Sequence, residues 1–303
     1  DHLLNWAMEL QEENLMRLAN PKLLGKHPLL AEGRLKYPIL QGHAWCYEQM
    51  LAVLTQRRIQ ERSQYRVERI LEPLSPVYGL VEVSKGHYRI GAREDAAAID
   101  NEMPAQIVEL SSFRIARRPV TNAHWLGFMR EGAYEDRTLW SEPGWSWCQK
   151  AAPHPDHWKQ DESGNWYGTG VHGPFDLTAD EPVTGINRFE AEVFANWISR
   201  KGGDLEGAVI QHEYQWEIAA RTRVIQDYGR CWEWCANIFQ PYTGYSPPDD
   251  SEAQTGDFEE RHYSLRGACL HSQRPLRRAS FRNRSLPGYR FGFSGTRLVF
   301  PPK

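Results

Sequence analysis

The chain has 303 residues, of which 41% are hydrophobic and 25% are charged. This length allows one large domain or two ordinary ones, and the composition is that of a globular protein, which excludes disordered and collagen-like chains. Lys and Arg number 36 against 39 Asp and Glu, a net charge of −3, so neither nucleic-acid nor anionic-membrane binding is expected. No apolar run approaches the roughly 20 residues that span a bilayer, and no signal peptide is visible at the start.

The five cysteines are scattered along the chain: Cys46, Cys148, Cys231, Cys235 and Cys269. An odd number without a secretory signal predicts free thiols in a reducing cytoplasm. Cys231 and Cys235 lie four residues apart, but no second pair follows at zinc-site spacing, so a structural zinc is not expected.

Residues 1–72 are predicted to be helical. Apolar residues recur at near-helical spacing between Leu3 and Leu15, and a second helix is predicted over roughly residues 39–66. Four apolar residues of this second helix share one face, at spacings i, i+3, i+4 and i+7: Tyr47, Met50, Leu51 and Leu54.

The composition and the hydrophobic pattern of the sequence change after residue 72. Two prolines, Pro73 and Pro76, cannot continue a helix, so residues 73–78 are predicted to be a linker. Residues 79–83 alternate like a strand, and residues 87–91 are predicted to be its hairpin partner.

The rest of the chain is predicted to contain short strands and few helices. Helices are expected at residues 122–131 and 188–201, each with aromatic residues on one face. Residues 140–175 form a long, Trp-rich, irregular stretch, which is typical of a functional loop or of one pinned by its own side chains.

Six sequence motifs follow one another between residues 79 and 300. They are the Gly-rich segment 79–91, the F-R-I-A-R-R-P-V-T-N run at 113–122, E-P-V at 181–183 with Ala191 to Trp197, H-E-Y-Q-W-E-I-A-A-R at 212–221, W-E-W at 232–234, and R-G-A at 266–268 with S-F-R-N at 280–283 and G-F-S-G-T-R at 292–297. In this order they resemble the domain shared by formylglycine-generating enzymes and EgtB-like (ergothioneine-type) sulfoxide synthases, a distorted relative of the C-type lectin fold.

The EgtB-like branch is the better match. The segment L-W-S-E-P-G-W-S-W at 139–147 is similar to a motif of that branch, whose members carry a DinB-like helical bundle ahead of the lectin-like domain. The resemblance therefore implies an α+β fold. It comprises a DinB-like helical region at residues 1–72, a linker at 73–78, and a formylglycine-generating-enzyme-like domain at 79–303.

EgtB-like enzymes hold iron with three histidines, one from an early helix and two from a later H-x-x-x-H-x-E helix. Residues 47–53 resemble that later helix, with Tyr47 and Leu51 at the histidine positions. His43, Tyr47 and Glu48 are the candidates for an unusual Fe(II) site. In an alternative alignment residues 42–48 form the first-histidine helix and the later helix is missing. The competing interpretation makes His43 an ordinary, partly buried histidine. No nucleotide or flavin is expected.

The loop after residue 268 holds the substrates in sulfoxide synthases. The resemblance therefore implies substrate binding by Cys269, His271, Arg274, Arg277 and Arg278. A guanidinium fork suits carboxylate recognition because it donates two charge-assisted hydrogen bonds. The alternative is that these arginines lie on the surface or brace Glu213, Glu217 and Glu233. Arg282 and Arg297 match residues with a structural role.

Two tyrosines, Tyr242 and Tyr245, lie where EgtB-like proteins have a P-Y-P-G-F loop near the active cavity. They are the candidates for the family's catalytic tyrosine. The remaining histidines are expected to be structural or solvated: His212 at a helix N-cap, His124 on the surface, and His154, His157 and His172 in a solvated loop.

The function that the resemblance implies is oxygen-dependent C–S (or C–Se) bond formation by a divergent EgtB-like oxidoreductase. Its partners would be a small-molecule thiol and a histidine betaine. The first alternative is a catalytically inactive ligand-binding or protein-interaction module on the same fold. The second is a formylglycine-type cysteine maturase, which is disfavoured because that branch holds copper with a cysteine pair near the C-terminal core, where this chain has Cys269 alone. The sequence does not indicate an oligomeric state.

Overall fold

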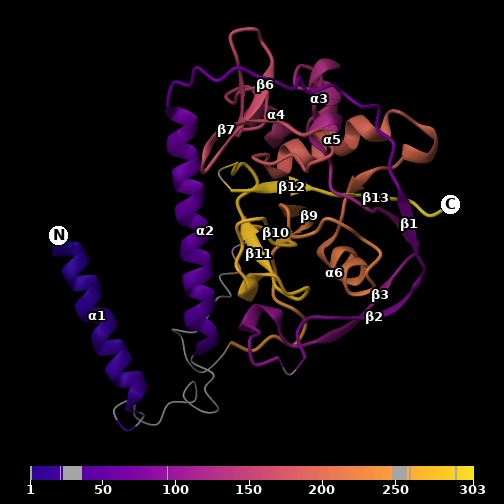
Figure 1. Ribbon diagram of the computed structural model, residues 1–303. Helices are drawn as coiled ribbons and strands as arrows, with labels where there is room; N and C mark the ends of the chain where they lie inside the picture. The colour runs from indigo at the N-terminus through magenta and orange to yellow at the C-terminus, as the bar shows by residue number, and fades with distance from the viewer. Residues whose placement is uncertain are drawn as a thin grey trace.

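The computed structural model describes residues 2–20, 22, 36–93, 95–247, 258, 261–290 and 292–303. Two helices come first, α1 (His2–Ala19) and α2 (Lys36–Gln60). The predicted helical region also includes residues 21 and 23–35, which lie outside the described residues. In Figure 1 the indigo helix α2 runs along one flank of the strand-rich region, and α1 stands apart beyond it. None of the described helices is long and apolar enough to cross a membrane.

One face of α2 packs against the strand-rich region. Its buried residues follow helical spacing and form a single stripe: Gln41, Ala44, Glu48, Ala52 and Thr55. This stripe contacts β6 (Trp166–Gly170) and the short 3₁₀ helix η7 (Arg274–Leu276). Of the four apolar residues predicted to share one face, Leu51 packs partly against the core, whereas Tyr47, Met50 and Leu54 are exposed. Both sides of this helix carry apolar residues, so spacing alone does not identify the buried side.

The second helix runs from Lys36 to Gln60, so it ends several residues before the predicted end near residue 66. Two aspartates of the strand-rich region bind the following segment in an extended form. Asp176 accepts hydrogen bonds from the Tyr65 hydroxyl at 2.9 Å and the Arg69 amide at 3.0 Å. Asp161 accepts one from the Val67 amide at 3.1 Å. These contacts replace the helical hydrogen bonds that residues 61–69 would otherwise make.

Thirteen short strands form four sheets in the described part of the chain. The first sheet has the order β1 (Leu80–Val83), β4 (Phe113–Ala116), β13 (Leu298–Phe300) and β8 (Val209–Ile210). The second has the order β11 (Asn283–Ser285), β10 (Tyr263–Arg266), β9 (Trp232–Ile238) and β12 (Ser294–Thr296). The others are the pair β2 (Gly86–Ile90) and β3 (Gln106–Leu110), and the antiparallel sheet β5 (Trp158–Gln160), β6 and β7 (Gly173–Asp176).

The predicted hairpin between residues 79–83 and 87–91 is wrong. Strand β1 pairs with β4, and β2 pairs with β3. The two pairings continue one register, so β1 and β2 are successive halves of the same arm, interrupted at residues 84–85. The chain reverses between residues 91 and 105 instead.

Four further helices are α3 (Asn122–Arg130), α4 (Glu142–Cys148), α5 (Arg188–Ser199) and α6 (Glu213–Arg221), with 3₁₀ turns η3 (Asp100–Glu102), η4 (Arg137–Leu139) and η5 (Gly203–Leu205). The helices predicted at 122–131 and 188–201 are confirmed. Helix α6 begins with His212 as its N-cap, whose side chain accepts the Tyr214 amide at 3.1 Å, as expected. The stretch 140–175 is less irregular than predicted, because it contains α4, β5, β6 and part of β7.

Buried ion pairs join the motif residues of the strand-rich region. Arg282 donates to Glu213 at 2.8 Å, and Arg297 donates to Glu233 at 2.8 Å. All four side chains are almost fully buried, and a buried charge without a partner is strongly destabilising. The structural role predicted for Arg282 and Arg297 fits these contacts.

Candidate functional site

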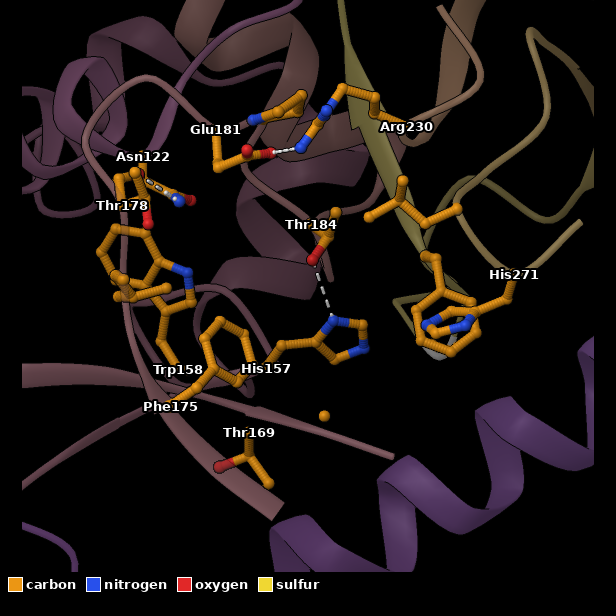
Figure 2. A pocket seen from close by; sticks show the side chains of 16 residues that line it. Asn122, His157, Trp158, Thr169, Phe175, Thr178, Glu181, Thr184, Arg230 and His271 are labelled. Carbon is orange, nitrogen blue, oxygen red and sulfur yellow. Dashed lines mark hydrogen bonds and ion pairs between the residues drawn. The ribbon is translucent and has the colours of Figure 1, made fainter. Parts of the chain in front are cut away.

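A cavity of about 360 Å³ opens between the sheet β5–β6–β7 and the loop after β10 (Figure 2). Its volume lies within the range of small-molecule sites. The lining residues are Asn122, His157, Trp158, Gly168, Thr169, Gly170, Phe175, Leu177, Thr178, Glu181, Pro182, Thr184, Arg230, Leu270, His271 and Phe293. Helix α2, which packs on β6, passes the edge of this view. The cavity therefore lies next to the junction of α2 and the strand-rich region.

His157 is the most constrained polar group of this cavity. Its side chain is 4% exposed, and its Nδ1 atom lies 3.1 Å from the Thr184 hydroxyl. Its Nε2 atom is buried and has no hydrogen-bond partner among the described residues. Figure 2 shows the ring pointing into the space between the cavity walls, with Nδ1 turned toward Thr184. This nitrogen therefore has a hydrogen-bonding capacity that the described residues do not use.

Burial keeps His157 neutral. It lowers the pKa of the imidazole to about 4, and the nearby His271 acts in the same direction, against the opposing charge of Asp156. A neutral imidazole offers one donor and one acceptor nitrogen. At neutral pH, Nε2 can therefore either donate or accept one hydrogen bond, depending on what Thr184 does at Nδ1.

The local fold explains why His157 is held so firmly. Its carbonyl accepts the Thr169 amide at 2.8 Å, which joins it to β6. On the other side lies Gly185, whose φ of +80° is in the left-handed region. A Cβ atom built on Gly185 would lie 2.8 Å from Cγ of His157. A side chain at residue 185 would therefore occupy space that the imidazole needs.

His271 faces His157 from the opposite wall (Figure 2). Both imidazole rings contact Phe293, with centroid distances of 4.3 Å for His271 and 5.6 Å for His157. Burial lowers the pKa of His271, and His172 lowers it further. Two imidazoles on facing walls, with the Phe293 ring in contact with both, thus line one end of the cavity.

The opposite end of the cavity carries two charges. Glu181 and Arg230 form an ion pair on the wall (Figure 2) and keep 41% and 35% of their side-chain surface exposed. Trp158 and Phe175 supply aromatic surface nearby. This combination suits a zwitterionic ligand: the guanidinium can take a carboxylate, and the carboxylate and aromatic faces attract a cation.

The predicted substrate-binding residues are only partly brought together. His271 lines the cavity, whereas Cys269 is fully buried behind the loop and burial raises the pKa of its thiol to about 12. Arg277 donates to the carbonyls of Cys269 and Ser272, each at 2.8 Å. Arg278 pairs with Glu102, and Arg274 is exposed on η7. None of the three arginines braces Glu213, Glu217 or Glu233 in the described contacts.

Neither candidate tyrosine lines this cavity. Tyr242 is buried in the core, 4.1 Å from the Arg282 guanidinium, and its hydroxyl donates to Glu217 at 3.5 Å. Burial raises its pKa strongly. The Tyr245 hydroxyl donates to Asp100 at 2.7 Å, and burial together with this carboxylate raises its pKa to about 12. Both hydroxyl groups are engaged with carboxylates of the protein.

The candidate metal ligands of α2 point in different directions. His43 and Tyr47 are exposed, whereas Glu48 lies in the buried stripe. Among the described residues, no group of three or more His, Cys, Asp or Glu side chains is arranged to hold a metal ion. The described donor set therefore does not fit the three-histidine iron centre that the EgtB-like resemblance implies.

Sequence reasoning missed several residues of the cavity. His157, expected in a solvated loop, is buried, and His124, expected on the surface, is buried on α3 with its pKa lowered by burial to about 4. Glu181 was noted only as part of the E-P-V motif, and Arg230 was not singled out. The available signal was the cluster of histidines and tryptophans within residues 140–175, which is unusually dense for a solvated loop.

Comparison with known proteins agrees with this architecture. Residues 71–228 match the family described as the sulfatase-modifying factor enzyme 1-like domain. A protein of Mycolicibacterium thermoresistibile named hercynine oxygenase is 30% identical over 68% of this chain and 55% of its own length. Its namesake in Mycobacterium tuberculosis is 29% identical over 70% and 58%. The chain thus spans little more than half the length of these relatives. PvdO from Pseudomonas aeruginosa shares the fold, with a TM-score of 0.54 and 15% identity over 78% of this chain and all of that one.

Proposed function

The chain belongs to the family of sulfatase-modifying factor enzyme 1-like domains, and we propose that it is a divergent EgtB-like oxidoreductase. Its reaction would join the sulfur of a small thiol, or selenium in its place, to the ring carbon of a histidine-derived betaine. One oxygen atom of O₂ would remain on the sulfur as a sulfoxide, and the other would leave as water with the two displaced hydrogens. The 30% identity to a hercynine oxygenase supports this substrate class.

The observation that carries the proposal is the cavity that presents paired charges, aromatic walls and an unpartnered imidazole nitrogen together. Arg230 would bind the betaine carboxylate in place of Glu181. The trimethylammonium group would rest against Trp158 or Phe175. Nε2 of His157, buried and without a described partner, would hold a nitrogen of the substrate ring. These roles require only binding and orientation.

A second candidate function is a ligand-binding module without redox chemistry. It is favoured by the described donor set, which does not assemble a three-histidine iron centre. The same cavity would then bind the betaine without converting it. The Fe(II) ligation by His43, Tyr47 and Glu48 stays a prediction.

Three further predictions belong to the same proposal. Helices α1 and α2 would be part of a DinB-like region within residues 1–72, separated by the linker 73–78 from the domain at 79–303. Tyr242 and Tyr245 would reach the substrate only after a rearrangement of their contacts with Glu217 and Asp100. A cytoplasmic location stays a prediction from the scattered cysteines.

Calorimetric titration of the protein with hercynine, histidine and cysteine tests the proposal. We expect hercynine to bind, and Arg230→Ala to weaken its binding by about tenfold, the loss of one charge-assisted contact. Arg58→Ala is the matched control, because Arg58 is exposed and pairs with Glu61 on the outside of the molecule. Binding that is unchanged in Arg230→Ala, or absent for all three compounds, would contradict the assignment of this cavity.

Aerobic incubation of the same protein with Fe(II), hercynine and cysteine separates the two candidate functions. A sulfoxide adduct detected by mass spectrometry supports the oxidoreductase. Hercynine binding without any adduct, under conditions in which a hercynine oxygenase forms one, supports the ligand-binding module.

A further inference from the structure

The buried stripe of α2 contains one charged residue, Glu48, whereas its other four members are uncharged. Glu48 is 6% exposed. Its neighbours along the stripe, Ala44 and Ala52, are small, so the carboxylate reaches past them into the strand-rich region. A carboxylate at such a position is costly unless hydrogen bonds compensate for the lost solvation.

Both oxygens of Glu48 accept hydrogen bonds from the strand-rich region. The Trp232 indole donates to one at 2.5 Å, and the Ser272 hydroxyl donates to the other. The Ser272 oxygen in turn accepts the backbone amide of Cys269 at 2.9 Å. These partners lie 184 and 224 residues further along the chain. Glu48 thus connects α2 to the start and the end of the four-residue loop 269–272.

This loop carries two lining residues of the cavity, Leu270 and His271. Arg277 holds it from the opposite side by donating to the carbonyls of Cys269 and Leu270 at 2.8 and 3.1 Å. The Cys269 amide and the Ser272 hydroxyl are therefore connected to α2, the Leu270 amide donates to the Arg230 carbonyl at 3.3 Å, and Arg277 holds two of the loop carbonyls. Release of the α2 contact would remove one of the three attachments of the loop that carries His271, and leave those to Arg277 and to the Arg230 carbonyl.

We propose that Glu48 is a positioning residue, which acts through Ser272 to set where the His271 imidazole lies in the cavity. It does not touch the cavity itself. This role makes the shape of the ligand site depend on the seating of α2. A role of His271 in catalysis rests on the proposed function. The effect of Glu48 on the position of the His271 ring does not.

Opposing effects on the pKa of the Glu48 carboxyl agree with this role. Burial raises the pKa of Glu48, while hydrogen bonds from Ser272, Trp232 and Cys269 and the charge of Arg277 oppose the rise. No basic residue forms a direct ion pair with it in the described contacts, so its hydrogen bonds, more than its charge, define the contact. Glutamine keeps the same shape and one acceptor, and the Ser272 hydroxyl can accept from its amide group.

The test is the NMR signal of the His271 ring in protein carrying ¹³C-labelled histidine, assigned with His271→Asn. The Phe293 ring, 4.3 Å from His271, shifts this signal, so the signal reports the position of the loop. In Glu48→Ala we expect the signal to move toward that of a solvent-exposed histidine and the His271 pKa to rise toward its ordinary value. Glu48→Gln should restore the native signal.

Two controls make the result specific. Thr55→Ala alters the same buried stripe, but the Thr55 hydroxyl bonds to the Leu51 carbonyl of its own helix at 2.9 Å. The His157 signal reports the far wall of the cavity. We expect Thr55→Ala to leave the His271 signal in place. Glu48→Ala should shift the His157 signal less than that of His271, because His157 feels His271 only as a neighbour.

If Glu48→Ala does not fold, Ser272→Ala cuts the same connection at its other end and should reproduce the shift of His271. An unmoved His271 signal in the folded variant, or an equal shift in Thr55→Ala, would overturn the proposal. The measurement needs no ligand, so a failure of hercynine to bind would leave it unaffected.

Discussion

Replacement of Gly185 with alanine should lower the unfolding free energy by more than the backbone cost of losing a glycine. The added methyl group should also displace the cavity wall. Gly185 has φ +80°, and a Cβ there would lie 2.8 Å from Cγ and 2.9 Å from the backbone nitrogen of His157. The first of these atoms belongs to a ring packed in the cavity, and the second belongs to the backbone immediately before β5. Neither can move aside without shifting the wall.

The magnitude follows from two separable costs. An alanine in the left-handed region costs about 1–2 kcal/mol relative to glycine, and forcing a methyl group into a packed site costs about 1–3 kcal/mol more. The sum for Gly185→Ala is about 2–5 kcal/mol. The same substitution at Gly164 isolates the first cost, because Gly164 has φ +81° and its Cβ would meet no atom within 4 Å.

Urea denaturation followed by tryptophan fluorescence compares the two variants. Gly164→Ala should lose about 1–2 kcal/mol of unfolding free energy, and Gly185→Ala should lose clearly more. The His157 ring signal should move only in Gly185→Ala. Equal losses in both variants, or an unmoved His157 signal, would refute the inference that Gly185 makes room for the imidazole.

Three other outcomes are expected. Burial opposes ionisation of Glu213, but Arg282 and Arg266 outweigh it and lower the pKa of the carboxyl to about 2. The ionised carboxylate contributes unfolding free energy on the order of 3 kcal/mol. This contribution is complete above the ordinary pKa of Glu and is lost as the pH falls toward 2. Glu213→Gln should remove this pH dependence when the unfolding free energy is measured in acid. The pKa of His157 is lowered to about 4 in the folded protein, so its imidazole takes up a proton more readily in the unfolded chain. The unfolding free energy should therefore fall as the pH decreases from 6.5 to 4. His157→Gln should flatten this part of the plot of unfolding free energy against pH. Asp176→Ala should speed tryptic cleavage at Arg66 or Arg69, because the tyrosine and amide donors of residues 65–69 lose their acceptor.

Much of the fold could be predicted because the motif residues carry their own physical requirements. The segment 212–221 has an N-cap, an apolar face and acidic residues that need partners, and it forms α6 with His212 as its cap. Arg282 and Arg297 stand among apolar residues, so they need buried carboxylates, which Glu213 and Glu233 supply. Local pattern and the cost of an unpaired charge point to the same structure.

The errors lie where pairing between distant segments decides the outcome. The hairpin at residues 79–91 was wrong because two strand-like runs can be successive halves of one arm, and only the register with residues 106–116 distinguishes the cases. The apolar spacing of α2 could not identify its buried face, because it fits both sides of the helix. The buried side is chosen by Glu48, whose partners lie at residues 232 and 272.

The candidate site was the least predictable part. Its charged wall comes from Glu181 and Arg230, and its imidazoles come from His157 and His271. These residues belong to different loops, and no periodicity in the sequence records which loops converge. Resemblance to a family predicted that the loop after residue 268 binds substrate, but it could not separate His271, which faces the cavity, from Arg277, which holds the loop in place.

The W-E-W motif of β9 links the fold to the site. Side chains of successive strand residues point to opposite faces, so Trp232 and Trp234 share one face and Glu233 has the other. Glu233 pairs with Arg297 inside the body, whereas the Trp232 indole donates to Glu48 on α2 and the Trp234 indole donates to the Ile186 carbonyl at 3.0 Å. Ile186 directly follows Gly185, which packs against His157. The same face of one strand therefore supports both imidazole walls of the cavity, one through α2 and Ser272 and the other through residues 185–186. For this reason a motif with an evident structural role also determines the geometry of the ligand site.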